Sequence, residues 1–372
     1  MAILPYPINL TPKPSELHPM CPVKDRLERW QPHPNIVQAL NILPEFQDRV
    51  REVTLRGWNK STRASYGAGL LIYHVFCDSR NVPEEERAPV DTNLISTFIS
   101  SLAGSYSGKT IHRYIYSVQA WHTLNGLPWI LHKDQIVVML KGAAKIAPPS
   151  SKQNLHKPIT VQMICDFHKQ LQATDPLDTA VFACLTTIFY AASRVGEFTT
   201  KQIDAFDPTQ HITPNGVHED IDCNGLSTTV FFLPSTKANS KGEEVNWAKQ
   251  SGPSDPHDTL LRHLQMNDSL FTYKKDGEHR PLTCHTFISR LKKLAKAAGY
   301  DHVHGHGLRI GATLEYLLRG IPFEVMKVKG RWASDTFQLY LRKHNQILAP
   351  YIQAMPTETA AKFIRIVMPP VR

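Results

Sequence analysis

The chain has 372 residues, of which 42% are hydrophobic and 20% are charged. This composition is typical of a globular protein, and the length favours two domains because one hydrophobic core rarely organises so long a chain. The net charge of +9 favours a polyanionic partner, since Lys and Arg release counterions when they bind phosphates. The 6 cysteines form no CxxC pair, which argues against a zinc finger or a disulfide framework. With no secretory signal and no run of about 20 apolar residues, we expect a soluble intracellular protein without a membrane partner.

The first part of the chain divides into an arm and a helical domain. Residues 1–45 are rich in proline and show little hydrophobic periodicity, so we expect an extended arm, either disordered or packed on a neighbour. Residues 46–146 repeat apolar side chains at helical spacing and predict a compact domain of about four or five helices. Helices are expected to begin near Ser61, Asp91 and Lys109.

A larger domain follows. Residues 147–157 have the composition of a linker, and the second domain is expected over residues 158–350. Its clearest helix opens at Asp175-Pro176 and leads through apolar positions to Arg194. Further helices are expected after Asp255, from Thr283 to Gly299, and over residues 308–319, 322–329 and 334–344.

One segment of the second domain has the composition of a β-hairpin. Residues 226–234 are rich in β-branched and aromatic side chains, and residues 243–249 are the expected partner strand. The fold class predicted from these elements is mainly α with a small β-sheet.

Five side chains suggest a site that binds a phosphodiester and attacks it with a phenol. Arg194 and Arg309 are candidates to bind phosphate, because a guanidinium donates parallel hydrogen bonds and keeps its charge. His306 lies one helical turn before Arg309 and is suited to proton transfer or to donation to a phosphate oxygen. Trp332 offers an indole N–H. Tyr340 is the candidate nucleophile, since neighbouring positive charge activates a phenol whose usual pKa is about 10.

Each of these residues has a simpler interpretation when taken alone. Arg194 is compatible with an ordinary helix end, and Trp332 and Tyr340 are compatible with a hydrophobic core. The alternating series His302, His304 and His306 would share one face of a strand and suit a metal ion. We favour a site without a metal, because no carboxylate or cysteine ligand lies at useful spacing.

The order of these residues resembles that of the tyrosine recombinases, the phage-integrase family. The resemblance is greatest to recombinases of eukaryotic mobile elements of the Crypton and DIRS type, which carry similar His-x-x-Arg-Ile-Gly-Ala and Gly-Arg-Trp-x-Ser-Asp blocks. It covers about residues 45–350 and is specific over residues 283–341. The matching residues are Arg194-Val195-Gly196-Glu197, His306-Gly307-Leu308-Arg309, Gly330-Arg331-Trp332 and Tyr340.

The resemblance implies a fold and a reaction. We expect a helical core-binding domain and an α+β catalytic domain that close on double-stranded DNA. Tyr340 is expected to form a 3′-phosphotyrosyl intermediate without any cofactor, with Glu197 supporting Arg194. A hairpin lysine is implied as the general acid, with Lys237 preferred and Lys241 as the alternative. Trp332 stands where many bacterial relatives have histidine, which is a known alternative in the family.

Further residues are candidates for DNA contact outside the reacting centre. Lys60 and Arg63 lie at a helix start, where backbone N–H groups favour phosphate. One helix presents polar side chains that are suited to base edges or, alternatively, form an ordinary solvated face. These are His112, Arg113, Tyr116, Gln119 and His122.

Three functions fit the sequence. The first is a site-specific recombinase or transposase that acts as a homo-oligomer, expected to be a tetramer on DNA, in the nucleus if the source is eukaryotic. Residues 351–372 would then form a tail that docks on a neighbouring protomer. The second is a type IB topoisomerase with the same chemistry, and the third is a domesticated DNA-binding protein that no longer cuts.

Overall fold

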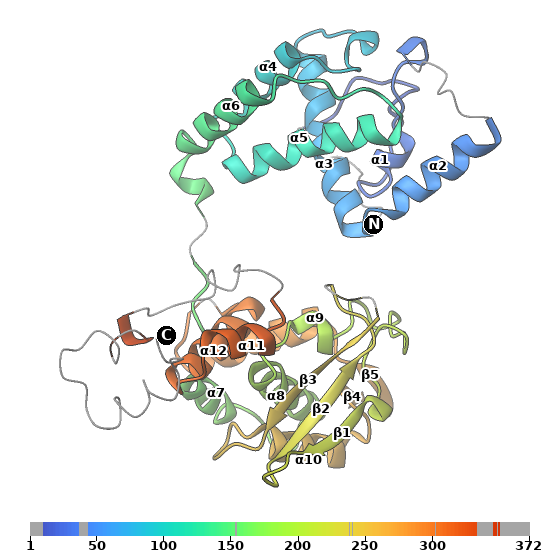
Figure 1. Ribbon diagram of the computed structural model, residues 1–372. Coiled ribbons are helices and arrows are strands. Elements are labelled where there is room, and N and C mark those ends of the chain that lie inside the picture. The colour runs from blue at the N-terminus through green and yellow to red at the C-terminus, as the bar shows by residue number, and fades with distance from the viewer. Residues whose placement is uncertain are drawn as a thin grey trace. The chain divides into compact units, whose positions relative to one another are not determined.

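The computed structural model describes residues 10–36, 44–152, 155–237, 239, 241–301, 303–332, 345–347 and 349. The chain divides into two compact units, residues 1–154 and 155–372, each with its own hydrophobic core (Figure 1). None of the described helices is long and apolar enough to cross a membrane.

The described residues of the first unit form helices and connecting loops, with no strand among them. Its α-helices are α1 (Arg26–Arg29), α2 (Pro44–Arg56), α3 (Lys60–Ser79), α4 (Thr92–Leu102), α5 (Gly108–Leu124) and α6 (Lys133–Lys145). Asp91 and Ser107 cap α4 and α5 by accepting hydrogen bonds from backbone N–H groups in the first turn. α3 and α5 pack closely because Gly69 leaves room for Ser117, whose Oγ would lie 2.2 Å from a Cβ at that position.

The N-terminal segment differs from the expected arm over residues 1–45. Its described part belongs to the core of the first unit, where Leu27 and Trp30 are fully buried. The Trp121 indole donates a hydrogen bond to the Trp30 carbonyl over 2.9 Å, and the His18 and His74 rings lie 3.8 Å apart. Proline content indicates an extended backbone, but it does not distinguish a free segment from one whose few apolar side chains fill a groove.

The second unit is mixed. Its helices are α7 (Val161–His168), α8 (Pro176–Tyr190), α9 (Val195–Phe198), α10 (Pro256–Asn267), α11 (Cys284–Ala297), α12 (Gly305–Leu318) and α13 (Phe323–Lys329). α8 is the central element: every residue from Asp178 to Tyr190 is buried, and it contacts α10, α11, α12 and the strands around it. The expected helix that opens at Asp175-Pro176 is therefore confirmed, and its burial brings the chain rigidly to Arg194.

The expected hairpin is also confirmed. β2 (Ser227–Leu233) pairs antiparallel with β3 (Glu243–Ala248) (Figure 1). Val245 and Trp247 of β3 are buried, and β3 contacts α8 and α10. Strand β1 (Val217–Ile221) pairs with the other edge of β2. A separate two-stranded sheet forms from β4 (Thr272–Lys275) and β5 (Glu278–Pro281). The sequence did not predict β1, β4 and β5, because short strands with mostly polar side chains lack the apolar alternation on which strand prediction depends.

The start of α12 is fixed by glycines that allow close backbone contact. The Ile159 N–H donates to the Gly307 carbonyl over 2.9 Å. A Cβ at Gly311 would lie 1.7 Å from the Ile159 carbonyl oxygen. The chain entering the second unit therefore lies directly on α12, and this contact fixes the helix turn that carries His306 and Arg309.

We predict that Gly311→Ala lowers the free energy of unfolding by about 1–3 kcal/mol or more, because the added methyl group displaces backbone. Gly142→Ala is the matched control, since Gly142 is also helical but faces open space. That change should raise stability by up to about 1 kcal/mol through helix propensity. Denaturant unfolding of the two full-length variants measures both effects, and equal stabilities would contradict the proposed close contact.

Candidate active site

Three of the predicted residues meet at one pocket in the second unit. Arg194 comes from the turn between α8 and α9, and His306 and Arg309 come from the first turns of α12. The remaining lining residues are Ser193, Val195, Cys284, Ile288 and Gly305. Two guanidinium groups and an imidazole around one cavity form a site suited to a phosphate group.

Arg194 is oriented by Glu197. Its backbone N–H donates to Glu197 Oε2 over 2.8 Å and its Nη1 donates to Oε1 over 2.9 Å. Burial would raise the pKa of the Glu197 carboxyl, but the charge of Arg331 and hydrogen bonds from Arg194 and Arg331 outweigh burial and lower that pKa. Glu197 is therefore a carboxylate at neutral pH, and the contact expected between it and Arg194 is present.

Arg309 is fixed by the segment after α13. Its side chain is almost fully buried, and Nη2 donates to the Gly330 carbonyl oxygen. The guanidinium carbon lies 4.4 Å from the ring centroid of Trp332, which is a cation–π contact. A Cβ at Gly330 would lie 1.6 Å from the indole, so this arrangement requires glycine. Trp332 thus contacts Arg309 directly and belongs to the same cluster of side chains.

The histidines around the pocket include one that the sequence did not single out. The His156 ring lies 4.6 Å from that of His304 and 5.8 Å from that of His306. Among the described residues, no group of three or more potential ligands is arranged to bind a metal ion, and His302 lies outside them. The structure therefore adds nothing in favour of the metal interpretation.

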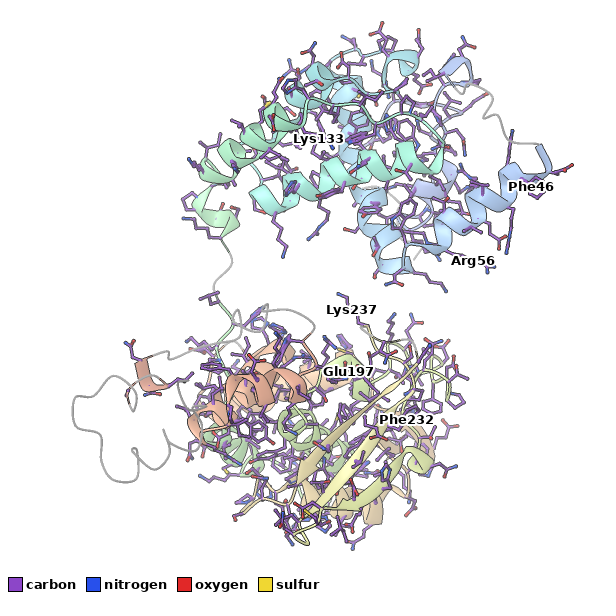
Figure 2. All side chains as sticks on the ribbon, viewed as in Figure 1. Phe46, Arg56, Lys133, Glu197, Phe232 and Lys237 are labelled. Atoms are coloured by element: carbon purple, nitrogen blue, oxygen red, sulfur yellow. The ribbon has the colours of Figure 1, made fainter. Side chains whose placement is uncertain are left out.

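The hairpin lysines do not line this pocket. Lys237 and Lys241 are both exposed near the turn between β2 and β3, and Lys237 projects from the tip of the hairpin (Figure 2). The Lys241 N–H donates to Asn239 Oδ1 over 2.9 Å, which shapes the turn. Tyr340, the expected helix over residues 334–344 and the tail over residues 351–372 lie outside the described residues, apart from residues 345–347 and 349 beyond that helix.

Arg331 and Glu243 are site residues that sequence reasoning missed. Arg331 donates from Nη2 to Glu197 Oε2 over 2.6 Å and from Nη1 to Glu243 Oε1 over 2.7 Å. Arg331 stands within the Gly330-Arg-Trp332 block, which was the available signal. Its partner Glu243 is far away in sequence, and no local pattern indicates that pairing.

Two solved structures of XerH, a site-specific recombinase, are similar to this chain. One is a post-cleavage complex with a palindromic difH substrate, with a TM-score of 0.54 and 14% identity over 82% of this chain and 84% of that one. The other is a pre-cleavage complex with difH, with a TM-score of 0.50 and 13% identity over the same shares. No protein-family model and no curated protein matches the sequence.

The chain has the tyrosine recombinase fold. The predicted fold class, mainly α with small antiparallel sheets, is confirmed.

The candidate DNA-binding residues of the first unit are mostly exposed, as a contact surface requires. His112, Arg113 and Tyr116 face solvent on α5, and Gln119 is half-buried. Lys60 is exposed at the start of α3. In contrast, Arg63 is half-buried and lies 3.6 Å from Glu28, so its charge is partly neutralised within the protein.

The assignment of His122 to the outer face of α5 is wrong. His122 is fully buried, and its Nε2 accepts a hydrogen bond from the Val90 N–H over 2.9 Å while Nδ1 lies 2.8 Å from the Val118 carbonyl oxygen. Burial lowers its pKa to about 4, so it is a neutral core residue. Its position one helical turn after Val118 places it on the packed side of the helix.

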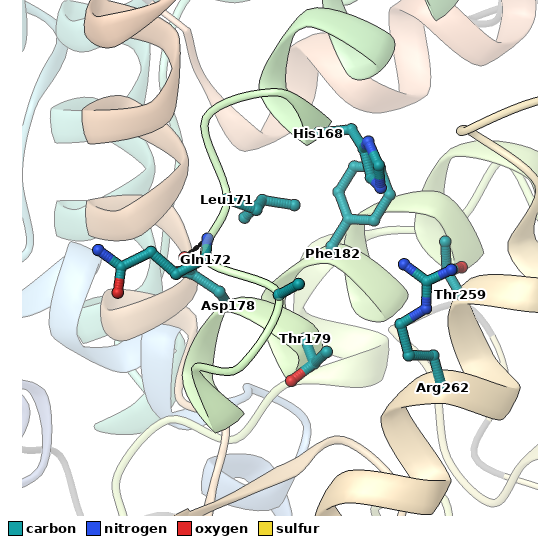
Figure 3. Close-up of a pocket in the computed structure, with 9 residues that line it drawn as sticks. His168, Leu171, Gln172, Asp178, Thr179, Phe182, Thr259 and Arg262 are labelled. Carbon is teal, nitrogen blue, oxygen red and sulfur yellow. Dashed lines mark hydrogen bonds between the residues drawn. The ribbon is translucent and has the colours of Figure 1, made fainter.

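A second pocket in this unit lies between the end of α7, the start of α8 and α10, and it contains none of the predicted site residues (Figure 3). The rings of His168 and Phe182 lie 5.1 Å apart at its wall. Asp178 accepts hydrogen bonds from the Gln172 N–H over 2.8 Å and from two nitrogens of Arg290 over 2.5 and 2.7 Å. Asp178 is therefore occupied in joining α8 to α11.

Lys329 connects the end of α13 to β3. Its Nζ donates to the backbone carbonyl oxygen of Asn246 over 2.8 Å and to the side-chain oxygen over 3.1 Å. Burial, and to a lesser degree the charge of Arg331, lower the pKa of Lys329 to about 8.

This lowered pKa predicts a pH-dependent stability. Between pH 8 and 10.5 the unfolded chain binds the Lys329 proton more tightly than the folded chain, so the free energy of unfolding rises with pH. The rise is on the order of 3 kcal/mol at most. Denaturant unfolding across this range should show the extra rise in the wild type relative to Lys329→Met, which lacks the titrating group. Parallel pH profiles for the two proteins would refute it.

Proposed function

We propose that this protein is a site-specific DNA recombinase that cleaves and rejoins strands through a tyrosine–DNA intermediate. One observation carries the proposal: Arg194, His306 and Arg309 line a single pocket in a chain with the tyrosine recombinase fold. Trp332 and Glu197 support the two arginines directly. The basic character of the chain is compatible with double-stranded DNA as the partner.

The chemistry follows from these side chains. The two arginines neutralise the negative charge that develops on the nonbridging oxygens of the scissile phosphate during the reaction. The Tyr340 oxygen bonds to phosphorus as its proton passes to His306, and the bond from phosphorus to the 5′-oxygen breaks. The hairpin lysine gives that oxygen a proton, leaving a 3′-phosphotyrosyl link and a 5′-hydroxyl. Attack by the 5′-hydroxyl of another strand reverses the step and exchanges strands.

The biological setting belongs to the same proposal. The resemblance of the Gly330-Arg-Trp332 block to Crypton and DIRS recombinases supports a role in the excision and integration of a mobile element in a nucleus. Exchange between two duplexes requires four cleaving subunits, so we propose a tetramer on DNA in which residues 351–372 contact the next protomer.

We predict that the wild-type protein forms a covalent adduct with DNA and that Tyr340→Phe does not, because only the phenol supplies the attacking oxygen. The probe is a pool of randomised duplexes that each carry a nick. Cleavage close to the nick lets the short fragment with the 5′-hydroxyl dissociate, so the strand cannot be rejoined and the covalent intermediate accumulates. Denaturation followed by phenol extraction separates protein-bound DNA, and sequencing of that DNA identifies the target.

The control is Tyr300→Phe, since the Tyr300 hydroxyl bonds to Asp166 instead of lying at the pocket. This variant should retain the adduct, and EDTA should not abolish it, because arginines supply the positive charge. An adduct of full yield from Tyr340→Phe would show that another residue is the nucleophile.

We further predict that Lys237→Ala slows cleavage of ordinary DNA by about 10²–10⁴-fold, the usual contribution of general acid catalysis. A substrate with sulfur in place of the bridging 5′-oxygen should restore the rate, because a thiolate leaves without protonation. Arg309→Ala should show no such recovery, since it acts on the nonbridging oxygens. Recovery with Lys241→Ala instead of Lys237→Ala would assign the proton to the other lysine.

A further inference from the structure

Arg331 lies at the junction of two parts of the second unit that the proposed reaction must coordinate. One nitrogen of Arg331 donates to Glu197. The same carboxylate accepts hydrogen bonds from the backbone N–H and the guanidinium of Arg194. The other terminal nitrogen of Arg331 binds Glu243. The side chains of Arg331, Glu197 and Glu243 are only 10%, 6% and 18% exposed, so these ion pairs are shielded from solvent.

Glu243 is the base of the hairpin that carries the lysines. It is the first residue of β3 and follows Lys241 and Gly242 directly. Gly242 has a φ of 86° and lies against the Phe232 ring, which leaves no room for a Cβ. The backbone between the lysine turn and Glu243 is therefore tightly constrained, and a displacement of Glu243 moves the turn.

The backbone conformation at Arg331 would suit glycine better than arginine, which indicates that the arginine side chain has a role of its own. The Arg331 N–H donates to the Val328 carbonyl and the Trp332 N–H donates to the Lys327 carbonyl, which is the hydrogen-bond pattern of a Schellman motif. Arg331 occupies the left-handed position of that motif with a φ of 55°. Glycine is favoured at this position because any Cβ is disfavoured. A side chain is present here despite the backbone geometry.

We propose that Arg331 is a positioning residue that sets the hairpin lysine relative to the phosphate-binding arginines. The proposal rests on the proposed recombinase function. Arg331 touches no reacting atom. It joins Glu243 at the base of the hairpin to Glu197 beside Arg194, and its neighbour Trp332 contacts Arg309. The proton donor and the charge-neutralising groups are thereby aligned by one guanidinium.

The test separates proton donation from phosphate binding. Glu243→Ala removes the hairpin contact but leaves the Arg331–Glu197 pair. It should slow cleavage of ordinary DNA by about 10²-fold, as misplacement of a catalytic group does. The sulfur-substituted substrate should restore the rate to within about tenfold of the wild type, because it needs no proton donor. A role in phosphate binding or in folding alone would slow both substrates equally.

Arg331→Gly is the second variant, because glycine suits the left-handed backbone and preserves the turn. The loss of two shielded ion pairs should lower its Tm, so the readout is the ratio of the two cleavage rates measured below that Tm. This ratio should favour the sulfur-substituted substrate over ordinary DNA. Glu244→Ala is the matched control: Glu244 is the next residue of β3 and faces solvent, so both rates should remain near those of the wild type. The DNA probe is the duplex selected by covalent trapping.

Three results would overturn the proposal. The first is a Glu243→Ala variant that cleaves ordinary DNA at the wild-type rate, and the second is a sulfur-substituted substrate that favours neither variant. In both cases the wild-type protein still cleaves, so the proposed function survives while the role of Arg331 fails. A wild-type protein that forms no adduct with either substrate overturns the recombinase function and, with it, this inference.

Discussion

The burial of the Arg309 guanidinium is the constraint on which the rest of the site depends. A permanent cation inside a protein requires polar or aromatic surroundings, and here the Gly330 carbonyl and the Trp332 ring provide them. These contacts require an empty Cβ position at Gly330 and a fixed start of α12, which the contact of Gly311 with Ile159 supplies. The segment entering the unit, α12 and the end of α13 are thus coupled through one side chain.

Glu197 provides the second organising contact. It is a shared acceptor for Arg194 and Arg331, and its buried carboxylate offsets part of the positive charge gathered around the pocket. Removal of one partner from such a buried network is costly because it leaves an uncompensated charge. Contacts within the protein therefore hold these guanidinium groups in place, and the proposed function needs such pre-organisation to stabilise a reacting phosphate.

The sequence predicted the elements whose signal is local. Helix α8, which Asp175 caps, and the β2–β3 hairpin were predicted from capping residues and hydrophobic patterning, and both are present. Arg194, His306 and Arg309 were grouped from their residue types and order, a grouping that the family resemblance reinforced, and the fold brings these three side chains to one pocket. The pairing of Arg331 with Glu243 was not predictable, since it depends on tertiary packing between α13 and β3. The same reason explains His122, whose exposure depends on the surroundings of α5 and not on its own polarity.

The candidate site residues lie on two kinds of element, a rigid helical core and an exposed turn. Arg309 extends from α12, which packs against the buried α8, and Arg194 lies in the turn that follows α8, so displacement of either would disturb the core. The hairpin lysines are exposed on a turn beyond the sheet. In the proposed reaction one of them would meet the leaving group when DNA binds. If a lysine on this turn donates a proton, the base of the hairpin must be fixed to the helical core of the unit. A long lysine side chain can compensate for small movements of the turn, but it cannot compensate for a shift of the whole strand. The contacts of Lys329 with Asn246 and of Arg331 with Glu243 fix β3 at two points on one side of that base.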